Sequence, residues 1–124
     1  MFPAVEKSTI DSIRYWAEQQ NKLGYETVWS LDECTDIDQS IFKAGRTYRV
    51  VYRFVDPDAT VEQMLDGTEQ WIEVSALAVN GTVRELWRAA ESCYQQAKAR
   101  GDWHYFIEDL ELLEDGSFEL TMGS

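Results

Sequence analysis

The sequence has few of the residues and patterns on which metal proteins and enzymes usually rely. It has one histidine, His104, and two cysteines, Cys34 and Cys93, which lie far apart. Structural zinc sites need closely spaced His and Cys ligands, so we expect no metal. The seven glycines are scattered and form neither a nucleophile elbow nor a phosphate-binding loop. We therefore expect no catalytic residues, no cofactor and no enzymatic activity.

Long apolar segments are also missing. No run approaches the roughly 18 to 20 apolar residues of a membrane-spanning helix. The first residues, MFPAVE, lack the basic and then apolar stretches of a signal peptide. We expect a cytoplasmic protein with free thiols and no membrane partner. Cys93 falls on an apolar helix face and should be buried, whereas the acids around Cys34 should raise its pKa.

Positive charge is scarce. The chain has 23 acidic against 11 basic residues, which gives a net charge of −12 at pH 7. Such a charge repels nucleic acid and anionic membranes at long range. Two interpretations stay open, namely that the acidic surface serves solubility or that it attracts a basic protein partner.

Apolar and aromatic residues are well represented. The hydrophobic fraction is 44%, and there are five Trp. This composition is typical of a folded domain rather than of a disordered chain. A length of 124 residues predicts a single domain, residues 1–124, that is large enough to bury a core.

The spacing of apolar residues predicts two long amphipathic helices. They run from about Thr9 to Leu23 and from Val83 to Arg100. Thr82 and Glu85 have the spacing of a capping box at the start of the second. A short helix is also predicted at about 61–66, because the run from Thr60 has capping-box spacing as well.

Alternating apolar residues predict five strands. They lie at about 25–31, 46–55, 69–79, 103–113 and 117–122. The order α-β-β-β-α-β-β indicates an α+β fold. Because sequential strands have short links, we expect a mainly antiparallel sheet of about five strands with both long helices on one face.

The last two strands should form a hairpin. A two-residue turn at Asp115-Gly116 would place Leu120 opposite a glutamate. A three-residue loop, 114–116, instead pairs Leu120 with Leu110 and Phe118 with Leu112. The two registers exclude each other, and the second pairs apolar with apolar side chains. We predict the longer loop, with Gly116 in a left-handed conformation.

One face of the predicted sheet is a candidate interface. Arg49 and Arg53 should form a charge-complementary ladder with Glu69 and Glu73 on the next strand. Aromatic residues dominate interface hot spots, and Trp71 should share this face with aromatic residues of the fourth strand. The candidate partner-binding residues are Trp71, Glu73, Trp103 and Tyr105, together with the acids Asp32, Glu33, Asp36 and Asp38 of one loop.

Two possible sites are rejected on spacing. Asp36 and Asp38 resemble the start of a calcium loop, but Ile41 stands where the sharp-turn glycine belongs. His104 would need an oriented partner to act as a general base, and Glu108 has the wrong spacing within a strand. We interpret His104 as an ordinary strand residue.

The C-terminal third carries a family resemblance. Its motifs are Glu85-Leu86-Trp87, Gly101, Trp103, Glu114-Asp115-Gly116 and Phe118-Glu119-Leu120. This run resembles the end of YezG-type immunity proteins, in which an acidic helix precedes a Trp-led strand, a Gly turn and a Phe-containing last strand. The resemblance implies a protein that neutralises a cognate toxin by binding it. In element order and acidity the chain is also similar to type III secretion chaperones, which act as homodimers.

Three functions follow as hypotheses. The first is an acidic binding protein of the immunity or antitoxin kind with a basic protein partner. The second is a homodimeric chaperone or adaptor, so the choice between monomer and homodimer stays open. The third is a small ligand-binding domain or enzyme, which would need a concave pocket between sheet and helices.

Overall fold

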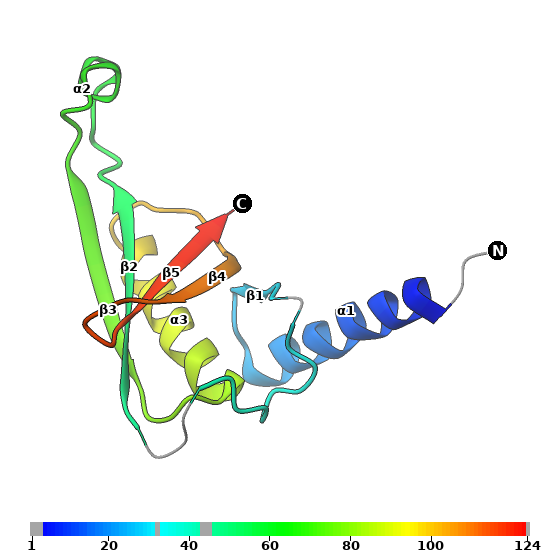
Figure 1. The fold of residues 1–124 in the computed structure, drawn as a ribbon. Helices are drawn as coiled ribbons and strands as arrows, with labels where there is room; N and C mark the ends of the chain where they lie inside the picture. Colours follow the sequence, from blue (N-terminus) through cyan, green and yellow to red (C-terminus); the bar gives the residue numbers. More distant parts are fainter. Residues whose placement is uncertain (1–3, 32, 43–45, 124) are drawn as a thin grey trace.

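The computed structural model describes residues 4–31, 33–42 and 46–123 (Figure 1). The helices in this part of the chain are α1 (Ala4–Leu23), α2 (Val61–Asp66) and α3 (Val83–Lys98). The strands are β1 (Val28–Trp29), β2 (Tyr48–Val55), β3 (Trp71–Ala78), β4 (Phe106–Leu112) and β5 (Phe118–Gly123). The predicted α+β class and element order are confirmed, including the short helix before β3. Helix α1 begins five residues earlier than predicted, and most strands are shorter.

The sheet is mixed, with two parallel pairings, but most of its paired residues are antiparallel, as expected. Its strand order is β1-β4-β5-β2-β3. The pairs β2–β3 and β4–β5 are antiparallel, whereas β1–β4 and β2–β5 are parallel. Short links constrain only strands that follow each other in the chain. The β2–β5 pair instead forms after α3 has carried the chain back along the sheet, so that β5 runs in the direction of β2.

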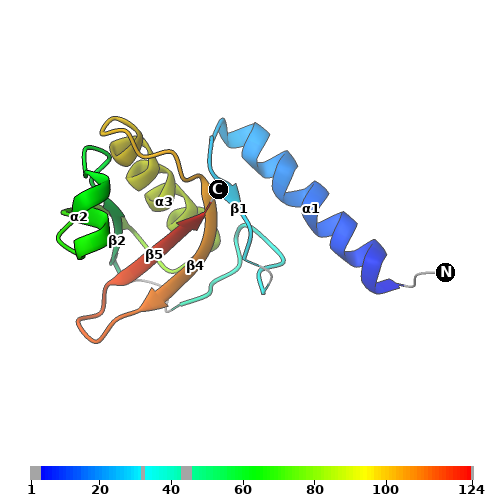
Figure 2. The same ribbon diagram turned by 90° about the horizontal axis from the view of Figure 1, so that it is seen from above.

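One face of the sheet is packed against α3. Alternate residues of β2 point toward this helix and are buried, as the period of two requires. The buried apolar residues of β2 on this face are Tyr48, Val50, Tyr52 and Phe54. Helix α1 joins the same core through Trp16, whose ring lies 6.0 Å from that of Trp87 and 6.1 Å from that of Trp29. The N-terminal half of α1 runs away from the sheet (Figures 1 and 2).

A buried polar network ties the segment before β1 to α3. The Glu91 carboxylate accepts hydrogen bonds from the Thr27 backbone N–H at 3.0 Å and from its hydroxyl at 2.6 Å. The Trp87 indole N–H donates to the same hydroxyl at 3.0 Å. Glu91 and Thr27 are 7% and 0% exposed, so these bonds satisfy polar groups that water does not reach.

The C-terminal hairpin has the predicted register. Leu110 lies opposite Leu120, and Leu112 lies opposite Phe118. Gly116 has a φ of +86°, the left-handed conformation that the three-residue loop requires. Matching apolar side chains across the pair therefore identified the correct turn.

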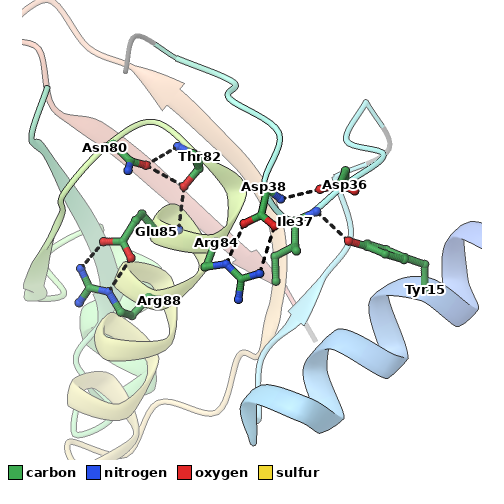
Figure 3. Close-up of polar contacts among 9 residues, drawn as sticks. All are labelled: Tyr15, Asp36, Ile37, Asp38, Asn80, Thr82, Arg84, Glu85 and Arg88. Atoms are coloured by element: carbon green, nitrogen blue, oxygen red, sulfur yellow. Dashed lines mark hydrogen bonds and ion pairs between the residues drawn. The ribbon is translucent and has the colours of Figure 1, made fainter. Parts of the chain in front are cut away.

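The start of α3 differs in one detail from the predicted capping box. Thr82 accepts from the Glu85 backbone N–H as expected, at 3.4 Å. The Thr82 N–H, however, donates to the Asn80 side chain at 2.9 Å, so it is already satisfied. The Glu85 carboxylate instead accepts from the Val79 N–H at 3.2 Å and pairs with Arg88 at 2.8 Å (Figure 3).

The opposite face of the sheet, which we call the open face, carries the odd-numbered residues of β2 and β3. Past the end of the sheet, β2 and β3 are joined by an arm, residues 56–70, which contains α2 (Figure 1). A capping box at Thr60 and a left-handed Gly67 delimit α2, yet none of its residues is buried. Val61, Met64 and Leu65 are all at least half exposed. Among the described helices, none has the length and apolarity needed to cross a membrane.

Candidate functional site

A concavity, which we call the cleft, opens where two parallel strands separate. Strands β2 and β5 pair only over Val50–Tyr52 and Phe118–Leu120. Beyond these residues the strands diverge (Figure 1). The cleft between them has a volume of about 840 Å³. Its walls come from the arm, from β5 and from the loop that joins α3 to β4.

Local sequence brings the α3–β4 loop to this place. Asp56 and Pro57 end β2 in a turn, closed by a bond from the Ala59 N–H to the Asp56 carbonyl at 2.9 Å. Gly101 ends the α3 segment with a φ of +99°. A Cβ on Gly101 would lie 3.1 Å from the Pro57 ring, so the loop passes close to the end of β2.

Two exposed tryptophans line the cleft. Trp71 begins β3, and Trp103 lies in the α3–β4 loop. They are 59% and 64% exposed. Met64 of α2 lines the same cleft and is 50% exposed. Large apolar side chains gathered at one concavity mark an interaction site more strongly than the same residues scattered singly.

His104 lies in the cleft wall with one ring nitrogen fixed. Its Nδ1 is 2.8 Å from Oδ1 of Asp102, whose other oxygen accepts a hydrogen bond from the Tyr52 hydroxyl at 2.7 Å. Because a carboxylate only accepts, Nδ1 carries the proton in this pair. When the ring is neutral, this tautomer leaves the Nε2 lone pair available as an acceptor. The His104 side chain is 34% exposed, and its ring stacks on Trp103 with centroids 4.3 Å apart.

Asp102 and Tyr52 form the buried support of His104. Asp102 is 8% exposed and Tyr52 is 3% exposed. Burial, followed by the hydrogen bond to Asp102, raises the pKa of Tyr52 well above its usual value. The phenol therefore keeps its proton and donates a hydrogen bond to Asp102, which fixes the carboxylate beneath the histidine.

The predicted charge ladder on the open face forms in part, because Glu69 precedes β3 and is in none of the ion pairs found among the described residues. Glu73 pairs with Arg53 at 3.1 Å and with Arg49 at 3.5 Å. Arg53 also lines the cleft. Because Glu73 is shared by two arginines, it balances only one of their two charges. The candidate residue Glu73 thus serves first as the partner of two arginines.

Acidic residues of the hairpin lie next to the cleft. Glu119 of β5 lines it, and Glu111 of β4 lies directly opposite Glu119 in the antiparallel pair. Like charges in that position destabilise a sheet. The sequence has no Lys or Arg after Arg100, so the hairpin contains no cation of its own.

The aromatic candidates are brought together only in part. Trp71 and Trp103 share the cleft, whereas Tyr105 lies outside it, 38% exposed, with its ring 4.6 Å from that of Phe106. Strand β4 begins at Phe106, so Trp103, His104 and Tyr105 precede it instead of lying within it. The hydrogen bonds of Asp102 to Tyr52 and His104 hold this segment in a loop.

The acidic loop lies at the other end of the protein, beside α1 and the start of α3 (Figure 3). Asp38 pairs with Arg84 at 2.8 Å, and this hydrogen bond lowers the Asp38 pKa. Asp36 accepts from the Asp38 N–H at 2.7 Å. Glu33 is exposed, and Asp32 lies outside the described residues. The charge of Asp38 is therefore partly matched within the chain.

Sequence reasoning missed Asp102 as the partner of His104. The two residues are separated by one position, and side chains two apart lie on the same side of an extended segment. The Asp-Trp-His spacing was therefore the available signal, although it does not show that the aspartate is buried.

Cys34 and Cys93 are both free thiols. Both thiols are buried, and burial raises the pKa of Cys93 to about 12. The Cys34 pKa is raised too, mainly by burial, with a smaller effect of Glu33. Within residues 4–31, 33–42 and 46–123, no three His, Cys, Asp or Glu side chains form a group that could hold a metal ion.

Comparisons of the chain with models of protein families, with curated proteins and with solved structures find no match. The resemblance to YezG-type immunity proteins stays a prediction.

Proposed function

We propose that the protein is an acidic binding domain, of the immunity or antitoxin kind, that captures a basic protein partner in the cytoplasm. The observation that carries this proposal is the pair of exposed tryptophans, Trp71 and Trp103, in one cleft. Tryptophans in a concave setting are typical binding hot spots. The net charge of −12 would accelerate encounter with a basic partner.

The tryptophans can supply substantial binding energy. Covering the exposed part of one Trp removes on the order of 100 Å² from water, worth about 2.5 kcal/mol at roughly 25 cal/mol per Å². Loss of about 2 kcal/mol weakens binding about 30-fold. Truncating Trp71 or Trp103 should therefore have a large effect on affinity and a small one on folding.

The edge of β3 is less suited to a partner strand. The Gln96 side chain donates to the Ser75 carbonyl at 2.9 Å, and the Arg88 side chain donates to the Leu77 carbonyl at 3.1 Å. These bonds from α3 occupy edge groups that an added strand would need. Recognition by side chains in the cleft is favoured over strand addition along this part of β3.

The proposal can be tested by affinity capture from the native lysate with matched variants. The tagged protein is compared with Trp71→Ala/Trp103→Ala and with the control Leu77→Ala/Leu112→Ala. Leu77 and Leu112 are 59% and 55% exposed and lie outside the cleft. We expect one basic protein to be retained at low salt by wild type and control, lost at high salt, and lost with the cleft variant. Equal retention by both variants would exclude the cleft as the contact surface.

The acidic loop is a separate contribution to the same proposal. Replacing Glu33 and Asp36 by Lys should slow association and weaken its salt dependence, while Asp38 keeps its pair with Arg84. Stopped-flow kinetics with the captured partner measure both. An unchanged rate would remove the loop from the encounter surface.

A homodimeric chaperone or adaptor is the second candidate, and α1 is the observation that favours it. The N-terminal half of this helix projects beyond the sheet (Figures 1 and 2), and Ile13 of the helix is 66% exposed. A second copy would cover this surface. Light scattering should then give twice the monomer mass for wild type and the monomer mass for Ile13→Asp; a monomeric wild type would reject this candidate.

A further inference from the structure

We infer that the cleft recognises the guanidinium of an arginine side chain on the basic partner. This inference rests on the proposed function and names the chemical group that the site takes. The guanidinium would lie against the indole faces of Trp71 and Trp103 and donate to His104 Nε2 and to the Glu119 carboxylate. All four residues line the same cleft.

The first step is the fixed orientation of His104. Nδ1 of His104 donates to Asp102, so in the neutral ring the other nitrogen, Nε2, is the hydrogen-bond acceptor. No described residue forms a hydrogen bond with Nε2, and this atom is not among the buried unpaired ones. An acceptor fixed in a cleft wall is complementary to a donor such as an N–H of guanidinium.

The second step is the aromatic lining. A cation within about 6 Å of an indole centroid is attracted to the ring, and the planar guanidinium also stacks on it. Trp103 has one face against His104 and is still 64% exposed. Trp71 lines the same cleft from the start of β3. Two different elements therefore each offer an indole to a flat cation.

The third step is charge. Glu119 is the acid that lies opposite Glu111, and a bound cation would relieve the repulsion between them. Arg53 also lines the cleft, and its guanidinium pairs at 3.1 Å with Glu73, a carboxylate that it shares with Arg49. The planar, five-donor guanidinium fits a carboxylate and a ring acceptor better than a compact ammonium does.

Short peptides provide the test. A peptide with one central arginine between uncharged residues is titrated into the whole protein. Parallel titrations use the same peptide with citrulline, lysine or norleucine in place of the arginine. Indole and imidazole NMR resonances report the contact. We expect the arginine peptide to shift the signals of Trp71, Trp103 and His104 and to bind about tenfold more tightly than the citrulline peptide, with lysine between them.

Two variants that lose the same charge distinguish direct contact in the cleft from attraction by the negative charge of the whole protein. Glu119→Gln and Glu111→Gln remove the same charge from facing residues, but only Glu119 lines the cleft. We expect Glu119→Gln to weaken the arginine peptide about fivefold and Glu111→Gln to weaken it less than twofold. Their far-UV circular dichroism should match wild type, because both positions lie on the sheet surface.

Three results would overturn the inference. They are equal binding of the arginine and citrulline peptides, equal effects of the two Glu variants, or shifts confined to resonances outside the cleft. Failure of the proposed function is distinguishable. If the cleft variant loses the captured protein while no arginine peptide binds, protein binding stands and arginine recognition is wrong. If the arginine peptide binds but no protein is captured, arginine recognition stands and the proposed capture of a protein partner is wrong.

Discussion

Asp102 offers the sharpest test of the architecture beneath the cleft. Its carboxylate accepts the hydroxyl of Tyr52 at 2.7 Å and lies 2.8 Å from Nδ1 of His104. Asp102→Ala removes a hydrogen bond to a charged group, worth about 1.5 to 3 kcal/mol. It also leaves the hydroxyl of Tyr52, a residue only 3% exposed, without this acceptor. We expect a loss of about 2 to 4 kcal/mol in the free energy of unfolding.

A double-mutant cycle isolates the bond. Tyr52→Phe removes the hydroxyl without a large cavity and should cost about 1 to 2 kcal/mol. In the double variant no hydroxyl is left unpaired, so the two losses should not add, and the coupling energy should be about 1.5 kcal/mol. Urea denaturation followed by tryptophan fluorescence measures all four proteins.

The outcome that would refute this reasoning is additivity within about 0.5 kcal/mol, which marks independent sites. Nitrogen NMR of the His104 ring is the functional counterpart. Once the ring has been titrated to its neutral form, the wild type should show the Nδ1–H tautomer, and Asp102→Ala should show a mixture of both tautomers.

Three further predictions concern stability and reactivity. Gly81→Ala would place a Cβ 2.6 Å from the backbone oxygen of Phe42, so we expect a loss of about 1 to 3 kcal/mol, visible as a lower melting temperature; an unchanged one would contradict the close approach. Burial raises the pKa of Cys93 to about 12, so a thiol reagent at about pH 8 should label it only after unfolding, and rapid native labelling would be inconsistent with its burial. The hydrogen bond from Arg88 lowers the pKa of Glu85 below its usual 4.5, so its stabilising effect should be present above that value and lost as the pH falls through the lower folded pKa. Glu85→Gln should therefore destabilise the protein at about pH 7 and have little effect at about pH 2 in urea titrations, whereas an equal effect at both would exclude the ion pair.

Short-range patterns explain why much of the fold was predictable. The capping box at Thr60 is formed by neighbouring residues, and it is present as predicted, together with the short helix that follows it. The hairpin register followed from matching Leu110 with Leu120, since one alternative would have placed leucine opposite an acid. The capping box at the start of α3 was half wrong because the Asn80 side chain competes for the same N–H group.

By itself, the sequence determined the element types, their order, the burial of Cys93 and the ladder between Glu73 and the arginines of β2, because these depend on side-chain period and local hydrogen bonding. Only the tertiary structure decided that β5 pairs in parallel with β2 and then diverges from it. That divergence opens the cleft, brings Trp71 and Trp103 to its walls and buries Asp102 beneath His104. Such contacts join residues far apart in the chain, so they depend on how the whole sheet packs against α3 and not on any local pattern.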